Sequence, residues 1–342
     1  MINGHGNNIY QYDKEAIEAD FSSNIAFNNH STKILSFLKG NMDSLCNYPD
    51  PMAVNLTERI ATYHGVDTSR VLVTNGSAEA FYLVAHYLSN SANGVCRTAI
   101  TTPSFAEYED SCRLHNHQIS YVELRAVTKF NISRLDSLWL ASPNNPDGYR
   151  ISIGDIYALA ATNRGCNIIL DRAYNDLSSD GEECCNLPEN VLLIESFTKF
   201  YGIPGLRLGY IVASPEIIAS LTQMRPPWSV NSLSLCAGEY ILANLEALRI
   251  DLDELIGESV YLQNAINDID GFRVEESKCN FFLLEITNGK SASQLYDYLL
   301  EQHGLLIRNC SNFKGLRGNY VRIAAQQRSS NDKLIKALQQ WK

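Results

Sequence analysis

Short apolar runs alternate with helix-length segments through the middle of this chain, and this alternation constrains the fold more than any other feature. The runs lie at residues 71–73, 98–101, 119–124, 138–141, 167–170, 191–194 and 208–212. Several of the segments between them, such as 106–115 and 153–162, are long enough for a helix. Strands separated by helices pair mostly in parallel beneath helical layers. We therefore predict an α/β fold with a mostly parallel sheet in a three-layer domain.

The last third of the chain has a different pattern. It predicts helices near residues 232–247, 251–268, 291–301 and 331–341, and strands at 272–274, 280–285, 305–308 and 320–324. This order is typical of a smaller α+β domain. We expect a large domain over residues 51–247 and the small domain over 248–342. Residues 1–50 are polar, and we expect them to form an arm that joins the small domain and lines a cleft.

Polar residues follow four of the predicted strands. They are Asn75, Asn145, Asp171 and Lys199. In a mostly parallel sheet, ligands bind beyond the carboxyl ends of the strands. The sequence therefore predicts that these four side chains meet at one edge of the sheet.

The loop after the strand at 191–194 carries a single lysine, Lys199. Gly202 and Pro204 prevent this loop from forming a regular helix. A semi-buried lysine near a second cation such as Arg207 loses its proton more readily and can form a Schiff base. Taken alone, the motif favours an ordinary loop lysine, because short motifs match by chance.

A glycine turn, Gly76-Ser77-Ala78, leads from the first strand into a helix. Backbone N–H groups at a helix N-terminus, together with the helix dipole, favour a bound phosphate. The same residues also fit an ordinary helix whose N-cap is Ser77. The sequence leaves both interpretations open.

The composition argues against several classes of protein. A net charge of −10 over 342 residues offers no basic surface for nucleic acid. The apolar runs are too short to span a membrane, and the first residues do not resemble a signal peptide. Nine irregularly spaced cysteines without a C-x-x-C motif predict reduced thiols in the cytoplasm and no metal site.

Three longer motifs lie at the predicted strand ends. They are Ser142-Pro143-Asn144-Asn145-Pro146, Asp171-Arg172-Ala173-Tyr174, and Thr198-Lys199 followed by Gly205-Leu206-Arg207-Leu208-Gly209. They resemble the S-P-N-N-P-T-G, D-E-A-Y and S-K…G-L-R-x-G motifs of the fold-type-I pyridoxal-phosphate enzymes, in the branch of histidinol-phosphate aminotransferase. The resemblance implies an aspartate aminotransferase-like fold and pyridoxal 5'-phosphate as the cofactor.

The resemblance also implies a role for each matching residue. Lys199 is expected to form the Schiff base, and Asp171 to pair with the ring nitrogen of the cofactor. Asn145 and Tyr174 are expected to bond its phenolic oxygen, and Tyr108 to stack on its ring. The residues implied to hold the phosphate are Gly76, Ser77, Ala78, Ser196, Thr198 and Arg207.

Tyr48 begins a Tyr48-Pro49-Asp50-Pro51 segment that resembles the family's Y-P-D-P. In that family the tyrosine reaches the cofactor phosphate of the partner subunit. The resemblance therefore implies a homodimer in which Tyr48 contributes to the neighbouring site.

Four further segments resemble the threonine-phosphate decarboxylases of cobalamin synthesis. They are residues 4–7, residues 198–205, Pro227-Trp228-Ser229-Val230-Asn231, and residues 306–313. The implied reaction is decarboxylation of L-threonine O-3-phosphate to (R)-1-aminopropan-2-yl phosphate. The residues implied to contact this phosphorylated amino acid are His5, Gly6, Asn24, Asn145, Arg308 and Arg322.

The cofactor motifs do not distinguish decarboxylation from transamination, because both reactions use them. A class I/II aminotransferase, such as histidinol-phosphate aminotransferase, is therefore the main alternative. A third alternative is a ligand-sensing domain of a regulator. We do not expect this function, because such regulators carry a DNA-binding extension and 342 residues leave no room for one. Three positions depart from the family pattern, namely Asp147, Arg172 and Gln326.

Overall fold

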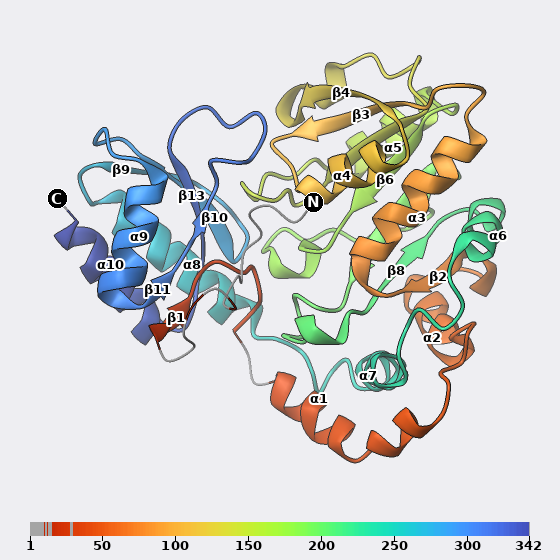
Figure 1. The fold of residues 1–342 in the computed structure, drawn as a ribbon, viewed down its shortest axis with the longest axis horizontal. Helices are drawn as coiled ribbons and strands as arrows, with labels where there is room; N and C mark the ends of the chain where they lie inside the picture. Colours follow the sequence, from red (N-terminus) through yellow and green to blue (C-terminus); the bar gives the residue numbers. More distant parts are fainter. Residues whose placement is uncertain (1–9, 11, 13–15, 28–29, 342) are drawn as a thin grey trace.

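The computed structural model describes residues 10, 12, 16–27 and 30–341, and its largest element is a seven-stranded sheet. Its strands are β2 (Val71–Thr74), β3 (Arg97–Thr102), β4 (Gln118–Glu123), β5 (Ser137–Ala141), β6 (Asn167–Asp171), β7 (Val191–Ser196) and β8 (Gly209–Val212). They lie in the order β2-β8-β7-β6-β5-β3-β4 (Figure 1). β8 runs antiparallel to both of its neighbours, β2 and β7, and all the other pairs are parallel. The predicted mostly parallel sheet is confirmed.

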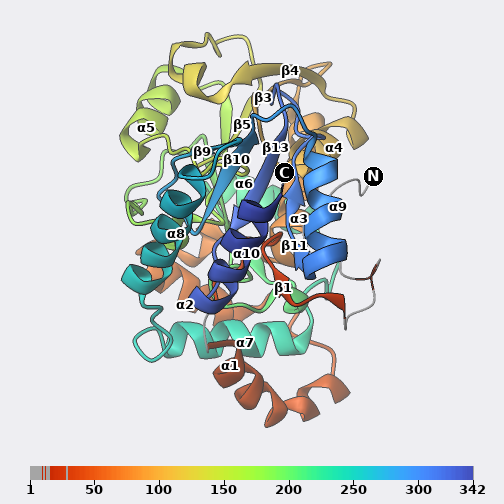
Figure 2. The same cartoon turned by 90° about the vertical axis from the view of Figure 1, so that its left-hand side faces the viewer.

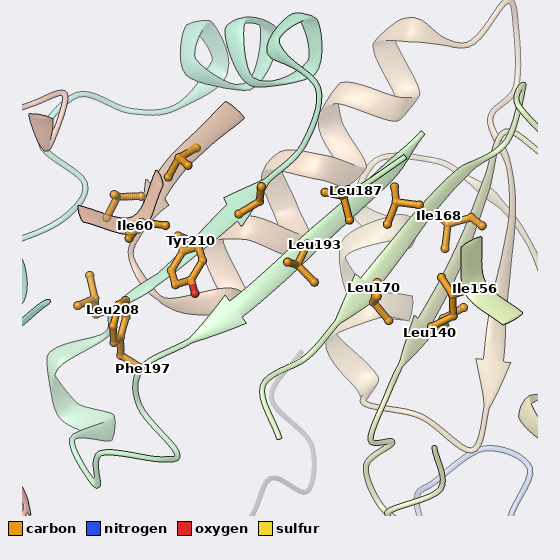
Figure 3. Close-up of a cluster of buried hydrophobic side chains, with 14 of the residues drawn as sticks. Ile60, Leu140, Ile156, Ile168, Leu170, Leu187, Leu193, Phe197, Leu208 and Tyr210 are labelled. Atoms are coloured by element: carbon orange, nitrogen blue, oxygen red, sulfur yellow. The ribbon is translucent and has the colours of Figure 1, made fainter. Parts of the chain in front are cut away.

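Helices cover both faces of this sheet, because its strands are apolar on both sides. One face packs on α2 (Val54–His64), α5 (Ile153–Thr162) and α7 (Ser232–Ala243), and the other on α3 (Gly76–Ser91), α4 (Ala106–Leu114) and α6 (Pro215–Met224). Figure 3 shows part of the first core, in which Leu193 of β7 joins Ile60 and Ile156. The next residue back, Leu192, belongs to the second core. Successive side chains of the strand therefore pack into the cores on opposite faces of the sheet.

A four-stranded antiparallel sheet lies beside the first one and carries its own helices (Figure 1). Its strands are β9 (Phe272–Glu275), β10 (Phe281–Ile286), β12 (Arg308–Asn309) and β13 (Tyr320–Ala324), in the order β12-β13-β10-β9. The helices packed on it are α8 (Leu252–Asn267), α9 (Ala292–His303) and α10 (Arg328–Gln340). This agrees with the expected α+β unit in the last third of the chain.

The strand predicted over residues 305–308 is divided in two. β11 (Leu305–Leu306) pairs in parallel with β1 (Ala19–Asp20), whereas β12 pairs with β13. The chain changes partner between Leu306 and Arg308, so no single strand forms. Figures 1 and 2 both show β1 beside β11, where the N-terminal segment meets the second sheet.

The N-terminal segment then contacts β13 of the small sheet and the loop that follows β7 of the large sheet. Its Phe21 carbonyl accepts from the Ala324 N–H (2.9 Å), and its Ala26 N–H donates to the Lys199 carbonyl (3.1 Å). Further along, α1 (His30–Lys39) packs on α7, where Phe37 stacks on Tyr240. No helix in the described part of the chain is long and apolar enough to cross a membrane.

Candidate active site

A cavity of about 460 Å³ lies between the carboxyl edge of the large sheet and the strands β12 and β13. Pockets of this size hold small cofactors and substrates. The cavity brings together most of the residues that the sequence predicted. Those on its wall are Ser77, Ala78, Asn145, Asp171, Tyr174, Ser196, Thr198, Lys199, Arg207, Arg308 and Arg322.

Lys199 lies on the loop between β7 and β8, and its neighbours hold that loop in place. Thr198 is buried, and its Oγ1 lies 2.8 Å from the Oγ of Ser196. Burial, together with the positive charges of Arg322 and Arg207, lowers the pKa of Lys199 to about 8. Near pH 8, about half of the Lys199 amine is therefore neutral and able to act as a nucleophile.

The turn before α3 forms a cradle with Arg207. Gly76 has a φ of +76°, and a Cβ at this position would lie 2.7 Å from Nη2 of Arg207. The N-cap of α3 is Asn75, so the interpretation of Ser77 as an N-cap is wrong. Ser77 instead lies in the first turn, on the cavity wall. A helix N-terminus beside a guanidinium group is suited to a phosphate.

Asp171 ends β6 at the floor of the cavity. Its Oδ1 accepts from the Ala173 N–H (2.9 Å), and its Oδ2 accepts from the Tyr108 hydroxyl (2.5 Å). Burial raises the pKa of Asp171, and the hydrogen bonds from Tyr108 and Ala173 oppose this rise. Asp171 is thus a buried carboxyl group whose charged form is stabilised by two donors.

Tyr108 does not lie where it could stack on a cofactor ring in the cavity, which differs from the prediction. Tyr108 is 1% exposed, and its ring lies in the core against Phe81, with ring centroids 5.0 Å apart. The cavity wall instead contains Phe105, three residues earlier. The two aromatic residues have different surroundings because Phe105 precedes α4, whereas Tyr108 lies in the first turn of that helix.

Asn145 and Arg322 come from different sheets and meet at the cavity. Arg322 donates from Nη1 to the Asn145 Oδ1 (2.5 Å) and from Nη2 to the Ser22 carbonyl (2.5 Å). Its Nε is buried and has no partner among the described residues. Tyr174 lines the same cavity, and burial raises its pKa to about 12. A buried donor without a partner is costly, which favours a ligand at this position.

Arg308 lies directly opposite Arg322 across β12 and β13. Both side chains line the cavity although they are only 8% and 5% exposed. Arg308 donates from Nη2 to the Asn312 Oδ1 (2.8 Å), and burial lowers its pKa to about 10. Like charges that face each other across strands destabilise a sheet. An anionic ligand between or beside the two guanidinium groups would relieve that repulsion.

Some predicted residues do not reach this cavity. Asn24 is 1% exposed and is not on the wall, whereas its neighbours Ser23 and Ile25 are. Burial alternates along this segment, so adjacent side chains face different surroundings. Tyr48 is 84% exposed and also lies away from the wall. His5 and Gly6 lie outside the described residues.

The three departures from the family pattern also lie off the cavity wall. Asp147 accepts from the Asn144 side chain (2.7 Å), and Arg172 pairs with Glu195, with 3.6 Å between Nε and Oε1. Gln326 donates from its backbone to Asn331 (2.9 Å). None of the three therefore lines the cavity, and each is held by a partner elsewhere in the fold.

Sequence reasoning missed Phe105 and a charged group at the rim. Lys314 Nζ contacts both carboxylate oxygens of Glu109 (2.8 and 2.9 Å) and the Tyr121 hydroxyl (2.6 Å). All of these residues line the cavity. Lys314 directly follows the segment that resembles the decarboxylases, and this position in the sequence could have indicated that Lys314 lies near the cavity.

These residues fit the cofactor that the sequence implies. Pyridoxal phosphate requires an amine, an acid for its ring nitrogen and donors for its phosphate. Lys199, Asp171 and Arg207 provide these groups on one cavity wall. The contact between Gly76 and Arg207, which a Cβ would block, indicates that the phosphate cradle is a built feature.

The comparisons with known proteins agree with this geometry. The chain is 31% identical to the threonine-phosphate decarboxylase of Salmonella typhimurium, over 93% of this chain and 90% of that protein. The crystal structure of L-threonine-O-3-phosphate decarboxylase from Porphyromonas gingivalis matches with a TM-score of 0.88 and 33% identity, covering 93% and 97% of the two chains. Histidinol-phosphate aminotransferase from Clostridium acetobutylicum matches with a TM-score of 0.83 and 26% identity, covering 93% and 97%. A model of the family "Aminotransferase class I and II" matches residues 8–338, and the chain therefore belongs to that family.

Proposed function

We propose that this protein is a pyridoxal-phosphate-dependent decarboxylase that converts L-threonine O-3-phosphate to (R)-1-aminopropan-2-yl phosphate in cobalamin biosynthesis. The similarity to threonine-phosphate decarboxylases over most of the chain supports this activity. The observation that carries it is the pair of buried arginines, Arg308 and Arg322, that face each other at the cavity. A substrate with both a carboxylate and a phosphate offers two anions to two guanidinium forks.

The cofactor is pyridoxal 5'-phosphate, as in the rest of the family. When bound, it supplies an electron-accepting ring that stabilises the electron pair left on the substrate's α-carbon. Asp171 would hold the ring nitrogen, and Arg207 with the start of α3 would hold the phosphate. Asn145 and Tyr174 would face the phenolic oxygen, and Phe105, which lines the cavity, would lie beside the ring in place of Tyr108.

The residues around the substrate decide which bond breaks. Arg308 and Arg322 would bind the carboxylate and the phosphate of the substrate and so orient its α-carbon for loss of CO₂. Decarboxylation leaves an electron pair on the α-carbon, which must then accept one proton. Lys199 carries a titratable amine whose pKa is about 8, so it can supply that proton near neutral pH.

Product analysis tests this proposal. Incubation of the enzyme with L-threonine O-3-phosphate should release CO₂ and aminopropanol phosphate in equal amounts. The Lys199→Ala variant should release neither, because it lacks the amine. A parallel incubation with histidinol phosphate and 2-oxoglutarate tests the aminotransferase alternative. Transamination without CO₂ release would overturn the proposed function.

We also propose that the enzyme is a homodimer in which Tyr48 reaches the partner's cofactor phosphate. Tyr48 is 84% exposed and packs against Trp228, with ring centroids 5.2 Å apart. Leu45 and Met52, from the same segment, are 52% and 53% exposed. An exposed apolar patch of this kind favours a contact between subunits.

A cytoplasmic location remains part of the proposal. All nine cysteines are free thiols in the structure, which suits a reducing compartment. Fractionation of the native cells, with the enzyme followed by its CO₂ release, would check this location.

A further inference from the structure

Tyr108 makes a polar contact to the cofactor site although it lies outside the cavity. Its hydroxyl donates to Oδ2 of Asp171 at 2.5 Å, and its side chain is 1% exposed. A short bond from a neutral donor to a carboxylate is a charge-assisted hydrogen bond, which is among the stronger kinds. Tyr108 is therefore placed to act on the cofactor through Asp171.

The apolar core fixes the position of this hydroxyl before any ligand binds. Tyr108 lies in the first turn of α4, and its ring packs edge-on against Phe81 and tilted against Trp139, with centroids 5.0 and 6.0 Å apart. Both neighbours are fully buried. A ring held on several sides cannot easily move away from Asp171, so the hydrogen bond is preorganised.

Asp171 needs such support because burial disfavours its charge. Its two oxygens receive one donor each, the Ala173 N–H at Oδ1 and the Tyr108 hydroxyl at Oδ2. Burial raises the pKa of Tyr108 well above its ordinary value, so the phenol keeps its proton and remains a donor. An ionised Asp171 can form an ion pair with a protonated ring nitrogen, whereas a protonated Asp171 cannot.

We propose that Tyr108 is a positioning residue for the cofactor: its hydroxyl orients Asp171 and keeps it ionised for the ring nitrogen of pyridoxal phosphate. This role depends on the cofactor site alone and applies equally to decarboxylation and transamination. It differs from the stacking role that the sequence suggested, because the ring of Tyr108 never faces the cavity.

The binding of two cofactors that differ only at the ring nitrogen tests this proposal. Apo protein is titrated with pyridoxal 5'-phosphate and with 1-deazapyridoxal 5'-phosphate, which has a C–H group in place of the nitrogen. Wild-type protein should prefer the natural cofactor, because only that cofactor can pair with Asp171. In Tyr108→Phe, this preference should fall about tenfold, as expected for loss of a hydrogen bond to a charged group.

The ratio of the two affinities separates this role from a purely structural one. A substitution that only loosens the fold weakens both cofactors equally and leaves the ratio unchanged, which would overturn the proposal. The matched control is Tyr157→Phe, which removes a tyrosine hydrogen bond to the Cys185 carbonyl (2.9 Å) away from the cavity. It should leave the ratio at the wild-type value.

Two further outcomes keep the test decisive. Thermal unfolding of the apo protein shows whether Tyr108→Phe folds; if it does not, Tyr108→Met carries the same comparison, because a flexible apolar chain fills irregular core space. If wild-type protein binds neither cofactor, the cofactor site and the proposed function fail together. If wild type and Tyr108→Phe both bind pyridoxal phosphate tightly and prefer it over the deaza cofactor to the same extent, only the role of Tyr108 is contradicted.

Discussion

At the scale of single residues, the site depends on side chains whose ordinary properties are changed by their neighbours. Lys199 would be fully protonated in water, but burial and the charges of Arg322 and Arg207 lower its pKa to about 8. Burial also disfavours the charge of Asp171 and raises its pKa, but here hydrogen bonds from Tyr108 and Ala173 oppose the shift. The two groups therefore take different roles within one cavity.

The first prediction concerns the pH at which Lys199 reacts. Only the neutral amine is acylated, so labelling of the apo protein with acetic anhydride should rise through pH 8, well below the ordinary lysine pKa of about 10.4. Peptide mass spectrometry measures the labelled fraction at residue 199. Arg207→Gln removes a neighbouring positive charge and should move the midpoint to higher pH. A wild-type midpoint near that of ordinary lysine would contradict the described environment.

The second prediction concerns Gly76. Gly76→Ala places a Cβ 2.7 Å from the Arg207 guanidinium at a φ of +76°, and should weaken binding of pyridoxal phosphate at least tenfold. The matched control is Gly289→Ala, where φ is +83° but no atom lies within 4 Å of the new Cβ. Both variants carry a backbone strain of about 1–2 kcal/mol, measurable by thermal unfolding. Only Gly76→Ala should lose cofactor affinity.

At the scale of elements, the segment between β12 and β13 joins the two halves of the site. β12 and β13 present Arg308 and Arg322 side by side, and the loop between them carries Lys314 to Glu109 on α4. Gly315, with a φ of +90°, allows this loop to approach Thr102 so closely that a Cβ would lie 2.9 Å from that side chain. The loop therefore closes one side of the cavity.

The third prediction concerns this closure. Lys314→Ala should raise KM for the substrate several-fold, because the loop loses its attachment to α4 at the cavity rim. The free energy of unfolding should change by less than about 1 kcal/mol, as for other exposed ion pairs. The control is Lys278→Ala, which breaks an exposed pair with Asp180 (3.2 Å) away from the cavity and should not alter KM. An unchanged KM in Lys314→Ala would rule out a role in closure.

At the scale of the whole molecule, the site lies where two separately built sheets meet. The large sheet supplies Asp171 and Lys199, and the small sheet supplies Arg308 and Arg322. Each sheet has its own buried core, so the two arginines and the residues predicted to hold the cofactor belong to different packing units. The division at residues 50 and 247 remains a prediction, as does the homodimer.

The fourth prediction tests the shared site of the proposed homodimer. A Lys199→Ala subunit is co-expressed with a Tyr48→Ala subunit, and hybrid dimers are isolated with two affinity tags. If Tyr48 serves the partner's site, one site of each hybrid carries both lesions and the other carries none. The hybrid should therefore have about half of the wild-type activity. An inactive hybrid would show that Tyr48 does not act across the interface.

The sequence by itself determined the order of the elements and which polar residues gather at one edge of the large sheet. Buried strands in a parallel sheet are continuous apolar runs, and the chain shows each of them as a local pattern. Asp171 directly follows one such run and Lys199 lies on the loop after another, so their placement at one edge required only the rule for parallel strands. The family motifs added the expected partners of the cofactor, which are residues close in sequence to these strand ends.

Only the tertiary structure decided which side of each element faces the cavity. Phe105 and Tyr108 lie three residues apart, and the start of α4 between them sends one to the cavity and the other into the core. The pairing of Arg308 with Arg322 depends on the register of two strands, and the contact of Lys314 with Glu109 joins positions 205 residues apart. Such contacts arise from packing between distant segments, which no local pattern records.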